Sequence, residues 1–237
     1  MIYAGILAAG KGVRMHRQDL PKPFLLLGEK PIIVHTLEQF FVNQSVGHIV
    51  IVVQEDWLQY TEDLLDKYRL TGKACSIISG GANKTESIGF VANFIDQKFG
   101  VAEGDVLIAH DAIRPFLTQR LIDDHIAVTR ECGAANTAMK MNDSILITDG
   151  VKLGAVPSHH DMYAEQTPQS YSLVELRELL ATADERNLPL IGESEFPRMW
   201  LNFGYEMGIV YGEYFNMKII NPYDLEVANA LLKERTS

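Results

Sequence analysis

The sequence has little cysteine, no excess of positive charge and no long apolar run, and each shortage excludes a class of protein. Its two cysteines, Cys75 and Cys132, lack the paired spacing of a disulfide framework or a cysteine zinc site. The 31 acidic and 21 basic residues give a net charge of -10, which would repel the phosphate backbone of a nucleic acid. The apolar run 2–8 is too short to span a membrane, and no small-residue cleavage pattern follows it. We therefore expect a cytoplasmic protein that binds neither nucleic acid nor membrane.

Two familiar nucleotide-binding motifs are also missing. The run 2–8 opens into the turn Ala9-Gly10-Lys11-Gly12-Val13-Arg14-Met15, and the dinucleotide fingerprint requires a third glycine where this chain has Met15. The Gly-Lys-Ser/Thr run of the phosphate loop occurs nowhere. A glycine-rich turn after a buried strand still presents backbone N–H groups that bind phosphate oxygens. Because Arg14 and Lys22 follow closely, the turn predicts a polyphosphate ligand and transfer chemistry rather than a plain corner.

Apolar periodicity alternates strands with helices along most of the chain. The pattern predicts strands at 2–8, 48–53, 76–78, 105–110 and 134–139, and helices at 31–43, 57–68, 84–98 and 118–131, with Asp56 as one cap. Helices follow at 173–184, 195–203 and from Asn221-Pro222 onward, with strands at 207–211 and 216–220. We expect an α/β fold in one domain, 1–237, with a mostly parallel sheet, helices on both faces and a protruding arm at 142–169.

Two further motifs follow expected strands, and parallel strands bind ligands beyond their carboxyl ends. Gly80-Gly81 precedes Lys84 and Ser87, which suit a base, ribose or phosphate; a simple loop with a capped helix is the alternative. The run 110–116 contains Asp111, a reasonable magnesium ligand beside a triphosphate, and Arg114, a cation for a second anionic substrate. An Asp–Arg ion pair that fixes the loop is the competing reading, and both can hold at once.

Taken together, the motifs resemble the cytidylyltransferases that activate polyol phosphates, in isoprenoid and in teichoic acid synthesis. The resemblance covers nearly the whole chain and is carried by 7–15, 21–22, 80–87, 110–116, 166–169 and 216–218. It implies a Rossmann-like sheet with an extended β-arm that embraces a twofold partner, so we expect a homodimer. It also implies that CMP passes from CTP to a polyol phosphate with Mg²⁺ present. The segments 55–57, 212–216 and 222–225 look like the ribitol phosphate branch.

The resemblance also implies a role for individual residues. Arg14, Lys22 and Lys218 would be catalytic, because they match the cations that stabilise the reacting phosphates. The nucleotide would be bound by Ala8, Ala9, Gly10, Gly12, Gly80, Lys84, Ser87 and Ala112. The acceptor would meet Asp111, Arg114, Ser144, His159 and Thr167, with Asp111 also a metal ligand and Ser144 reaching in from the arm.

Two departures from the family pattern leave the acceptor open. Lys84 and His159 replace family arginines, and the change to histidine loses a permanent bidentate phosphate grip. We expect His159 to favour tighter acceptor binding in mild acid; an affinity that stays flat between about pH 6 and 8 would contradict this. We expect the acceptor to be D-ribitol 5-phosphate, and the alternatives are methylerythritol phosphate or another alditol or sugar phosphate. A catalytically silent, nucleotide-binding regulatory protein is a third hypothesis, which the retained cations disfavour.

Overall fold

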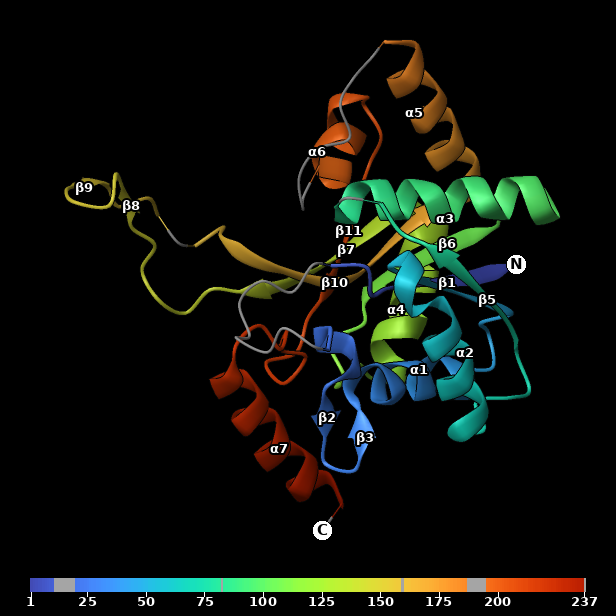
Figure 1. Ribbon diagram of the computed structural model, residues 1–237. Coiled ribbons are helices and arrows are strands. Elements are labelled where there is room, and N and C mark those ends of the chain that lie inside the picture. Colours follow the sequence, from blue (N-terminus) through green and yellow to red (C-terminus); the bar gives the residue numbers. More distant parts are fainter. Residues whose placement is uncertain (11–19, 82, 159, 187–194, 237) are drawn as a thin grey trace.

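The computed structural model describes residues 1–10, 20–81, 83–158, 160–186 and 195–236, and shows an α/β architecture (Figure 1). A seven-stranded sheet at its centre has the order β11-β7-β10-β6-β1-β4-β5. These strands are β1 (Ile2–Leu7), β4 (His48–Val53), β5 (Ala74–Ser79), β6 (Val106–Asp111), β7 (Ala134–Lys140), β10 (Tyr163–Ser172) and β11 (Gly208–Tyr211). Neighbours are parallel, except that β10 runs antiparallel to β6 and β7. The expected α/β class with a mostly parallel sheet is confirmed.

Helices cover both faces of the sheet because its central strands are apolar on both sides. In β4, Ile49, Ile51 and Val53 face one core, whereas Val50 and Val52 face the other. The first core is shared with α1 (Ile32–Val42), α2 (Leu58–Lys67) and α4 (Gln119–Cys132). The second is shared with α3 (Lys84–Phe99), α5 (Leu173–Glu185) and α6 (Glu195–Asn202), which Figure 1 shows above the sheet.

A third, smaller core joins the last helix to an early hairpin. The hairpin strands β2 (Leu26–Leu27) and β3 (Lys30–Pro31) follow a short 3-10 helix, η1 (Lys22–Phe24), and pack against α7 (Pro222–Thr236). The expected cap of α7 is present, since the Asp224 N–H donates to Asn221 Oδ1 at 3.0 Å. This core fixes the segment between β11 and α7 beside the start of the chain.

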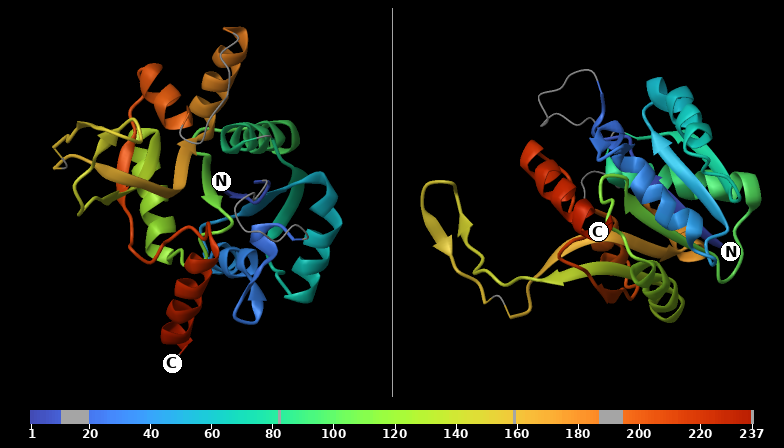
Figure 2. Two further views of the ribbon diagram at one scale, coloured as in Figure 1. Left: turned by 60° about the vertical axis from the view of Figure 1, so that its left-hand side comes forward. Right: turned by 90° about the horizontal axis from the view of Figure 1, so that it is seen from below.

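An arm projects from one side of the molecule (Figures 1 and 2). β7 and β10 pair outward as far as Lys140 and Tyr163, and beyond them β8 (Ile147–Thr148) and β9 (Leu153–Ala155) form a separate two-stranded sheet. The last part of the expected arm, 163–169, belongs to β10 and therefore to the central sheet.

Two local expectations were wrong. Asp56 does not cap α2, because it lies in a 3-10 helix, η2 (Glu55–Trp57), and α2 begins at Leu58. The segment 216–220 is not a strand; its apolar residues pack into the third core instead of joining the sheet.

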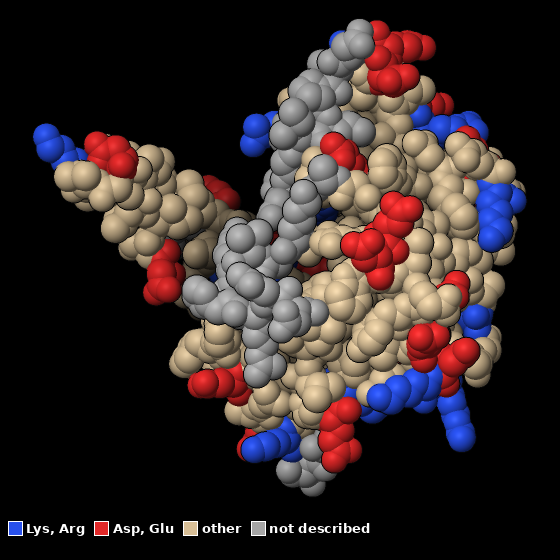
Figure 3. Space-filling model, viewed as in Figure 1, with Lys and Arg blue, Asp and Glu red and all other residues tan. Residues whose placement is uncertain are grey.

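On the face shown in Figure 3, Lys and Arg side chains are scattered among Asp and Glu. None of the helices in the described ranges has the length and apolarity needed to cross a bilayer.

Candidate active site

The predicted site motifs meet at one edge of the sheet, where the parallel strands end. Leu7, at the end of β1, pairs with Val52 of β4 and with Asp111 of β6. The next residue continues this registration, since the Ala8 N–H donates to the Val52 carbonyl at 2.7 Å. On the other side, the Ala112 N–H donates to the Leu7 carbonyl at 3.0 Å. The turn after β1 therefore lies beside the acidic end of β6.

The glycine loop after β5 packs against the turn after β1. A Cβ atom on Gly80 would lie 2.3 Å from Ala9 Cβ and 2.9 Å from Val52 Cγ1, so only glycine allows this approach. Gln54 fixes the same turn, because its Nε2 donates to the Ala9 carbonyl at 3.1 Å. The structure thus brings together the two loops predicted to bind the nucleotide.

The start of α3 lies next to these loops and is well capped. Asn83 Oδ1 accepts from the Glu86 N–H at 2.9 Å. Ser87 Oγ donates to the Asn83 carbonyl at 2.9 Å and accepts from the Gly81 N–H at 3.2 Å. Lys84 is the first residue of α3, so its ammonium adds to the positive end of the helix dipole. This combination of a helix N-terminus and a cation favours an anionic ligand.

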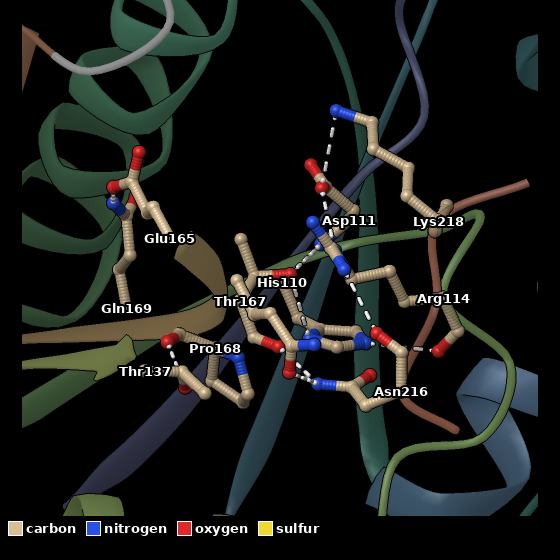
Figure 4. Close-up of polar contacts among 12 residues, drawn as sticks. His110, Asp111, Arg114, Thr137, Glu165, Thr167, Pro168, Gln169, Asn216 and Lys218 are labelled. Atoms are coloured by element: carbon tan, nitrogen blue, oxygen red, sulfur yellow. Dashed lines mark hydrogen bonds and ion pairs between the residues drawn. The ribbon is translucent and has the colours of Figure 1, made fainter. Parts of the chain in front are cut away.

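Asp111 lies at the centre of the charged groups (Figure 4). Its Oδ2 is 3.1 Å from Arg114 Nε and 3.2 Å from Lys218 Nζ. Burial alone would raise the pKa of Asp111, but Lys84, Lys218 and Arg114 together hold it well below its usual range. Burial lowers the pKa of Lys84, although Asp111 and Glu165 oppose that shift. One ionised carboxylate therefore gathers three cations at the sheet edge.

His110 and Thr167 hold Asp111 in place from behind. The Arg114 carbonyl can only accept, so His110 Nε2 donates to it, at 3.1 Å. His110 Nδ1 then accepts from the Thr167 hydroxyl at 3.1 Å, and that hydroxyl accepts from the Asp111 N–H at 3.1 Å. Burial lowers the pKa of His110 to about 4, which keeps the imidazole neutral and this donor pattern fixed.

Asn216 ties the strand ends to the segment that carries Lys218. Its Nδ2 donates to Gln166 Oε1 at 3.1 Å and to the Thr167 carbonyl at 2.8 Å. Its own carbonyl accepts from Arg114 Nη1 at 2.8 Å. In the sequence, Asn216 stands out only as part of the segment 216–218 that resembles the family. Its positioning role depends on contacts across 49 residues or more, which no local pattern reveals.

Lys22 reaches the same segment from the start of the chain. Its side chain is buried, and its Nζ donates to the Ile220 carbonyl at 2.8 Å. The structure therefore brings the predicted residues Lys22, Lys84, Asp111, Arg114 and Lys218 to one edge of the sheet.

Other predicted residues are placed differently. The Thr167 hydroxyl and both backbone groups of Ala112 already have partners, the Ala112 carbonyl accepting from Thr36 Oγ1 at 2.9 Å. Gly10 is exposed, and so is Ser144, which lies in the arm between β7 and β8. Their predicted contacts with substrate stay predictions. Three predicted residues lie outside the described part of the chain: Gly12, Arg14 and His159.

The described residues contain no group of three or more His, Cys, Asp or Glu side chains that could hold a metal ion. Asp111 is a single carboxylate whose Oδ2 already pairs with Arg114 and Lys218. Such a residue fits a magnesium ion held chiefly by the phosphates of a bound nucleotide, because Mg²⁺ commonly takes one or two carboxylates plus substrate phosphates.

Comparison with known proteins agrees with this site. The family described as IspD, 2-C-methyl-D-erythritol 4-phosphate cytidylyltransferase, matches residues 2–234. The chain belongs to this family. A ribitol-5-phosphate cytidylyltransferase of Lactiplantibacillus plantarum is 37% identical over 237 residues and is matched along 100% of both chains. As a member of the IspD family, the chain is a cytidylyltransferase that uses CTP and a polyol phosphate.

Solved structures of IspD enzymes share the fold. The 4-diphosphocytidyl-2C-methyl-D-erythritol synthase of Anaerococcus prevotii superposes with a TM-score of 0.80, at 24% identity, over 98% of this chain and 96% of the other. The 2-C-methyl-D-erythritol 4-phosphate cytidylyltransferase of Thermus thermophilus gives 0.74 at 22% identity, over 98% and 100% of the two chains. The Rossmann-like architecture that the sequence resemblance implied is therefore confirmed.

Proposed function

We propose that this cytidylyltransferase transfers CMP from CTP to D-ribitol 5-phosphate and releases pyrophosphate. The cluster of Lys84, Arg114 and Lys218 around Asp111, beside the packed glycine loops, is the observation that carries the reaction type. The relative named ribitol-5-phosphate cytidylyltransferase, 37% identical along its whole length, supports the choice of acceptor. Methylerythritol phosphate, named in the family description, is the second candidate acceptor.

In the proposed reaction, a phosphate oxygen of the acceptor attacks the α-phosphorus of CTP. The bond from that phosphorus to the bridging oxygen breaks, and pyrophosphate leaves with the electron pair. This displacement needs positioning and positive charge rather than a protein nucleophile. Lys22 and Arg14 would stabilise the α-phosphate and the leaving group, and Lys218 would approach the reacting phosphate. Arg114 would hold the acceptor phosphate, and Lys84 would bind a phosphate of the nucleotide.

The backbone of the glycine loops would hold the nucleotide. In this assignment, Ala8, Ala9, Gly10 and Gly12 bind the triphosphate, and Gly80 with Ser87 supports the nucleoside. A magnesium ion on the phosphates of CTP would neutralise charge that develops on the leaving group, with Asp111 as its protein ligand. Thr167, His159 and Ser144 complete the proposed acceptor side, with Ser144 contributed by the arm of a partner subunit in a homodimer.

Pyrophosphate release tests the proposal directly. CTP, UTP, ATP and GTP are each paired with ribitol 5-phosphate, methylerythritol 4-phosphate, glycerol 3-phosphate and several pentose phosphates, with magnesium present. We expect release only from CTP with ribitol 5-phosphate. In Lys22→Ala, kcat should fall about 100-fold or more, because a cation on the reacting phosphates is lost. Lys67→Ala, which removes a lysine at the end of α2, is the matched control.

A signal confined to methylerythritol 4-phosphate would replace the proposed acceptor with the second candidate. CTP binding without release from any acceptor would support the silent regulatory protein instead.

A further inference from the structure

A second carboxylate near the active site has no part in the reaction proposed above. Glu165 lies on β10, two residues before Thr167, and is exposed. Its Oε1 accepts from Asn136 Nδ2 of β7 at 3.1 Å and from Gln169 Nε2 of β10. Figure 4 shows Glu165 and Gln169 together on the opposite side of Thr167 from Asp111 and Lys218. Two amides on two strands therefore fix the direction of this carboxylate.

Asn136 and Gln169 direct their amide nitrogens toward Glu165, and this orientation leaves their amide oxygens without a partner in the described part of the chain. Among the described residues, Asn136 Oδ1 and Gln169 Oε1 are buried and have no hydrogen-bond partner. A buried acceptor left unpaired is unfavourable, and charge-assisted bonds from the same amides to a carboxylate offset that cost. A neutral side chain at position 165 would offer much less compensation. The arrangement is thus specific for a negative charge at this point.

The Glu165 carboxylate also interacts electrostatically with a cation of the candidate active site. Lys84, at the start of α3, interacts electrostatically with both Asp111 and Glu165. Lys84 therefore lies within the field of two carboxylates, one on each side of Thr167. Arg114 and Lys218 contact Asp111, whereas Glu165 lies on the other side of Thr167 from them, away from the cations expected at the acceptor phosphate (Figure 4). An ionised carboxylate only accepts hydrogen bonds, so a group that binds to it is a donor.

We propose that Glu165 is a specificity-determining residue that accepts hydrogen bonds from the hydroxyl groups of the acceptor. Carboxylate oxygens accept several bonds each, so hydroxyl donors add to the amide donors already present. A neutral polyol chain supplies such donors, whereas a chain ending in a second carboxylate is repelled. Glu165 selects both for hydroxyls and against anions. This inference rests on the proposed function, because it assumes that the phosphate of a polyol phosphate binds near Arg114 and Lys218.

Two acceptors of equal length test the inference. Ribitol 5-phosphate ends in a hydroxymethyl group, and 5-phosphoribonate ends in a carboxylate at the same carbon. Binding of each is measured by calorimetry with a non-hydrolysable CTP analogue, in the wild type, Glu165→Gln and Glu165→Ala. We expect both variants to bind ribitol 5-phosphate about tenfold more weakly than the wild type does. They should bind 5-phosphoribonate as tightly as the wild type or more tightly. Affinity for the CTP analogue should stay within about twofold.

Glu62→Gln, which makes the same charge change on the exposed face of α2, is the matched control and should leave every affinity unchanged. An unchanged ratio of the two acceptor affinities in Glu165→Gln overturns the inference, as does failure of both acceptors to bind the wild type. An unchanged ratio with tight binding of ribitol 5-phosphate overturns the inference alone, whereas failure of both acceptors to bind also contradicts the proposed function. Pyrophosphate release by the wild type tests the proposed function on its own.

Discussion

Asp111 interacts with three cations through one buried carboxylate, so its charge matters more than its shape. In Asp111→Asn, Lys218 and Arg114 would lose the carboxylate that they both contact, and Lys84 would keep only the weaker field of Glu165. We expect kcat/KM for the acceptor to fall about 100-fold, measured by pyrophosphate release. The same change at Asp184, exposed at the end of α5, should have no effect. Activity of Asp111→Asn near that of the wild type would show that the cluster does not need this charge.

The same charge predicts how stability responds to acid. The pKa of Asp111 is held below its ordinary value of 3.8, so the folded chain stays ionised where the unfolded chain binds a proton. Its contribution to stability is therefore present above that pH and is lost as the pH falls further. In Asp111→Asn, chemical denaturation should show a weaker dependence of unfolding free energy on pH in this acid range. An equally steep dependence in the variant would contradict the assignment.

Buried histidines extend the acid sensitivity toward neutral pH. Burial lowers the pKa of His110 to about 4 and that of His125 to about 3, from the ordinary histidine value of 6.5. Between about pH 6.5 and 4 the unfolded chain binds protons that the folded chain does not bind. The free energy of unfolding therefore decreases as the pH is lowered through this range. His125→Ala should remove one of the protons taken up on unfolding. The slope of unfolding free energy against pH should therefore decrease by about 1.4 kcal/mol per pH unit.

Denaturation of His125→Ala at several pH values separates that slope from the overall loss of stability. His125 bridges Ser170 Oγ at 2.6 Å and Thr137 Oγ1 at 2.7 Å, so its removal also costs about 2–4 kcal/mol at every pH. His35→Ala is the control, because His35 is not fully buried. A slope that remains equal to that of the wild type would mean that His125 is protonated in the folded protein.

At the scale of elements, the sequence predicted what depends on local periodicity. The helix expected at 84–98 and the strand at 48–53 agree with α3 and β4, because their apolar patterns and flanking glycines are local signals. The antiparallel insertion of β10 between β6 and β7 was not predicted, since strand order depends on pairing between distant residues. The same limit applies to the site: the charged motifs are visible in the sequence, whereas Asn216 and Glu165 make contacts with residues far along the chain that no local pattern reveals.

The segment 212–221 shows why pattern alone can mislead. Ile219 and Ile220 are typical strand residues, but the Ile219 N–H donates to the Ile113 carbonyl and the Ile220 carbonyl accepts from Lys22. Its backbone groups are thus satisfied by loops and side chains rather than by a sheet ladder. This irregular path delivers Asn216 and Lys218 to the site.

Glu213 anchors that segment to the start of α4. Its carboxylate accepts from Thr118 Oγ1 at 3.0 Å and from Arg120 Nη2 at 2.9 Å. We expect Glu213→Ala to lower kcat/KM about 3–10-fold through misplaced Lys218, with stability reduced by about 1 kcal/mol. Steady-state kinetics with both substrates measure the change. Asp124→Ala is the control, because it removes another Arg120 partner, at 2.7 Å, without touching the segment; an equal loss there would contradict the anchoring role.

At the scale of the whole molecule, the arm exposes apolar side chains that a single chain leaves uncovered. Leu146, Ile147, Leu153 and Val156 are 56–59% exposed, and Val151 is 89% exposed. Figure 2 shows the arm standing away from the body of the molecule. An apolar surface of this kind is typical of an association site. It supports the proposal that two chains embrace through their arms.

Ile147→Asp on β8 tests the proposed dimer. A charge buried against a partner costs several kcal/mol, so sedimentation should show the variant as a monomer at concentrations where the wild type is a dimer. Val42→Asp, at the end of α1 and 59% exposed like the arm residues, should leave the dimer intact. If Ser144 of one chain completes the site of the other, the monomeric variant should also lose acceptor binding while it retains CTP. A monomeric variant with full activity would keep the arm as an assembly element but remove Ser144 from the site, whereas a wild type that sediments as a monomer would remove both.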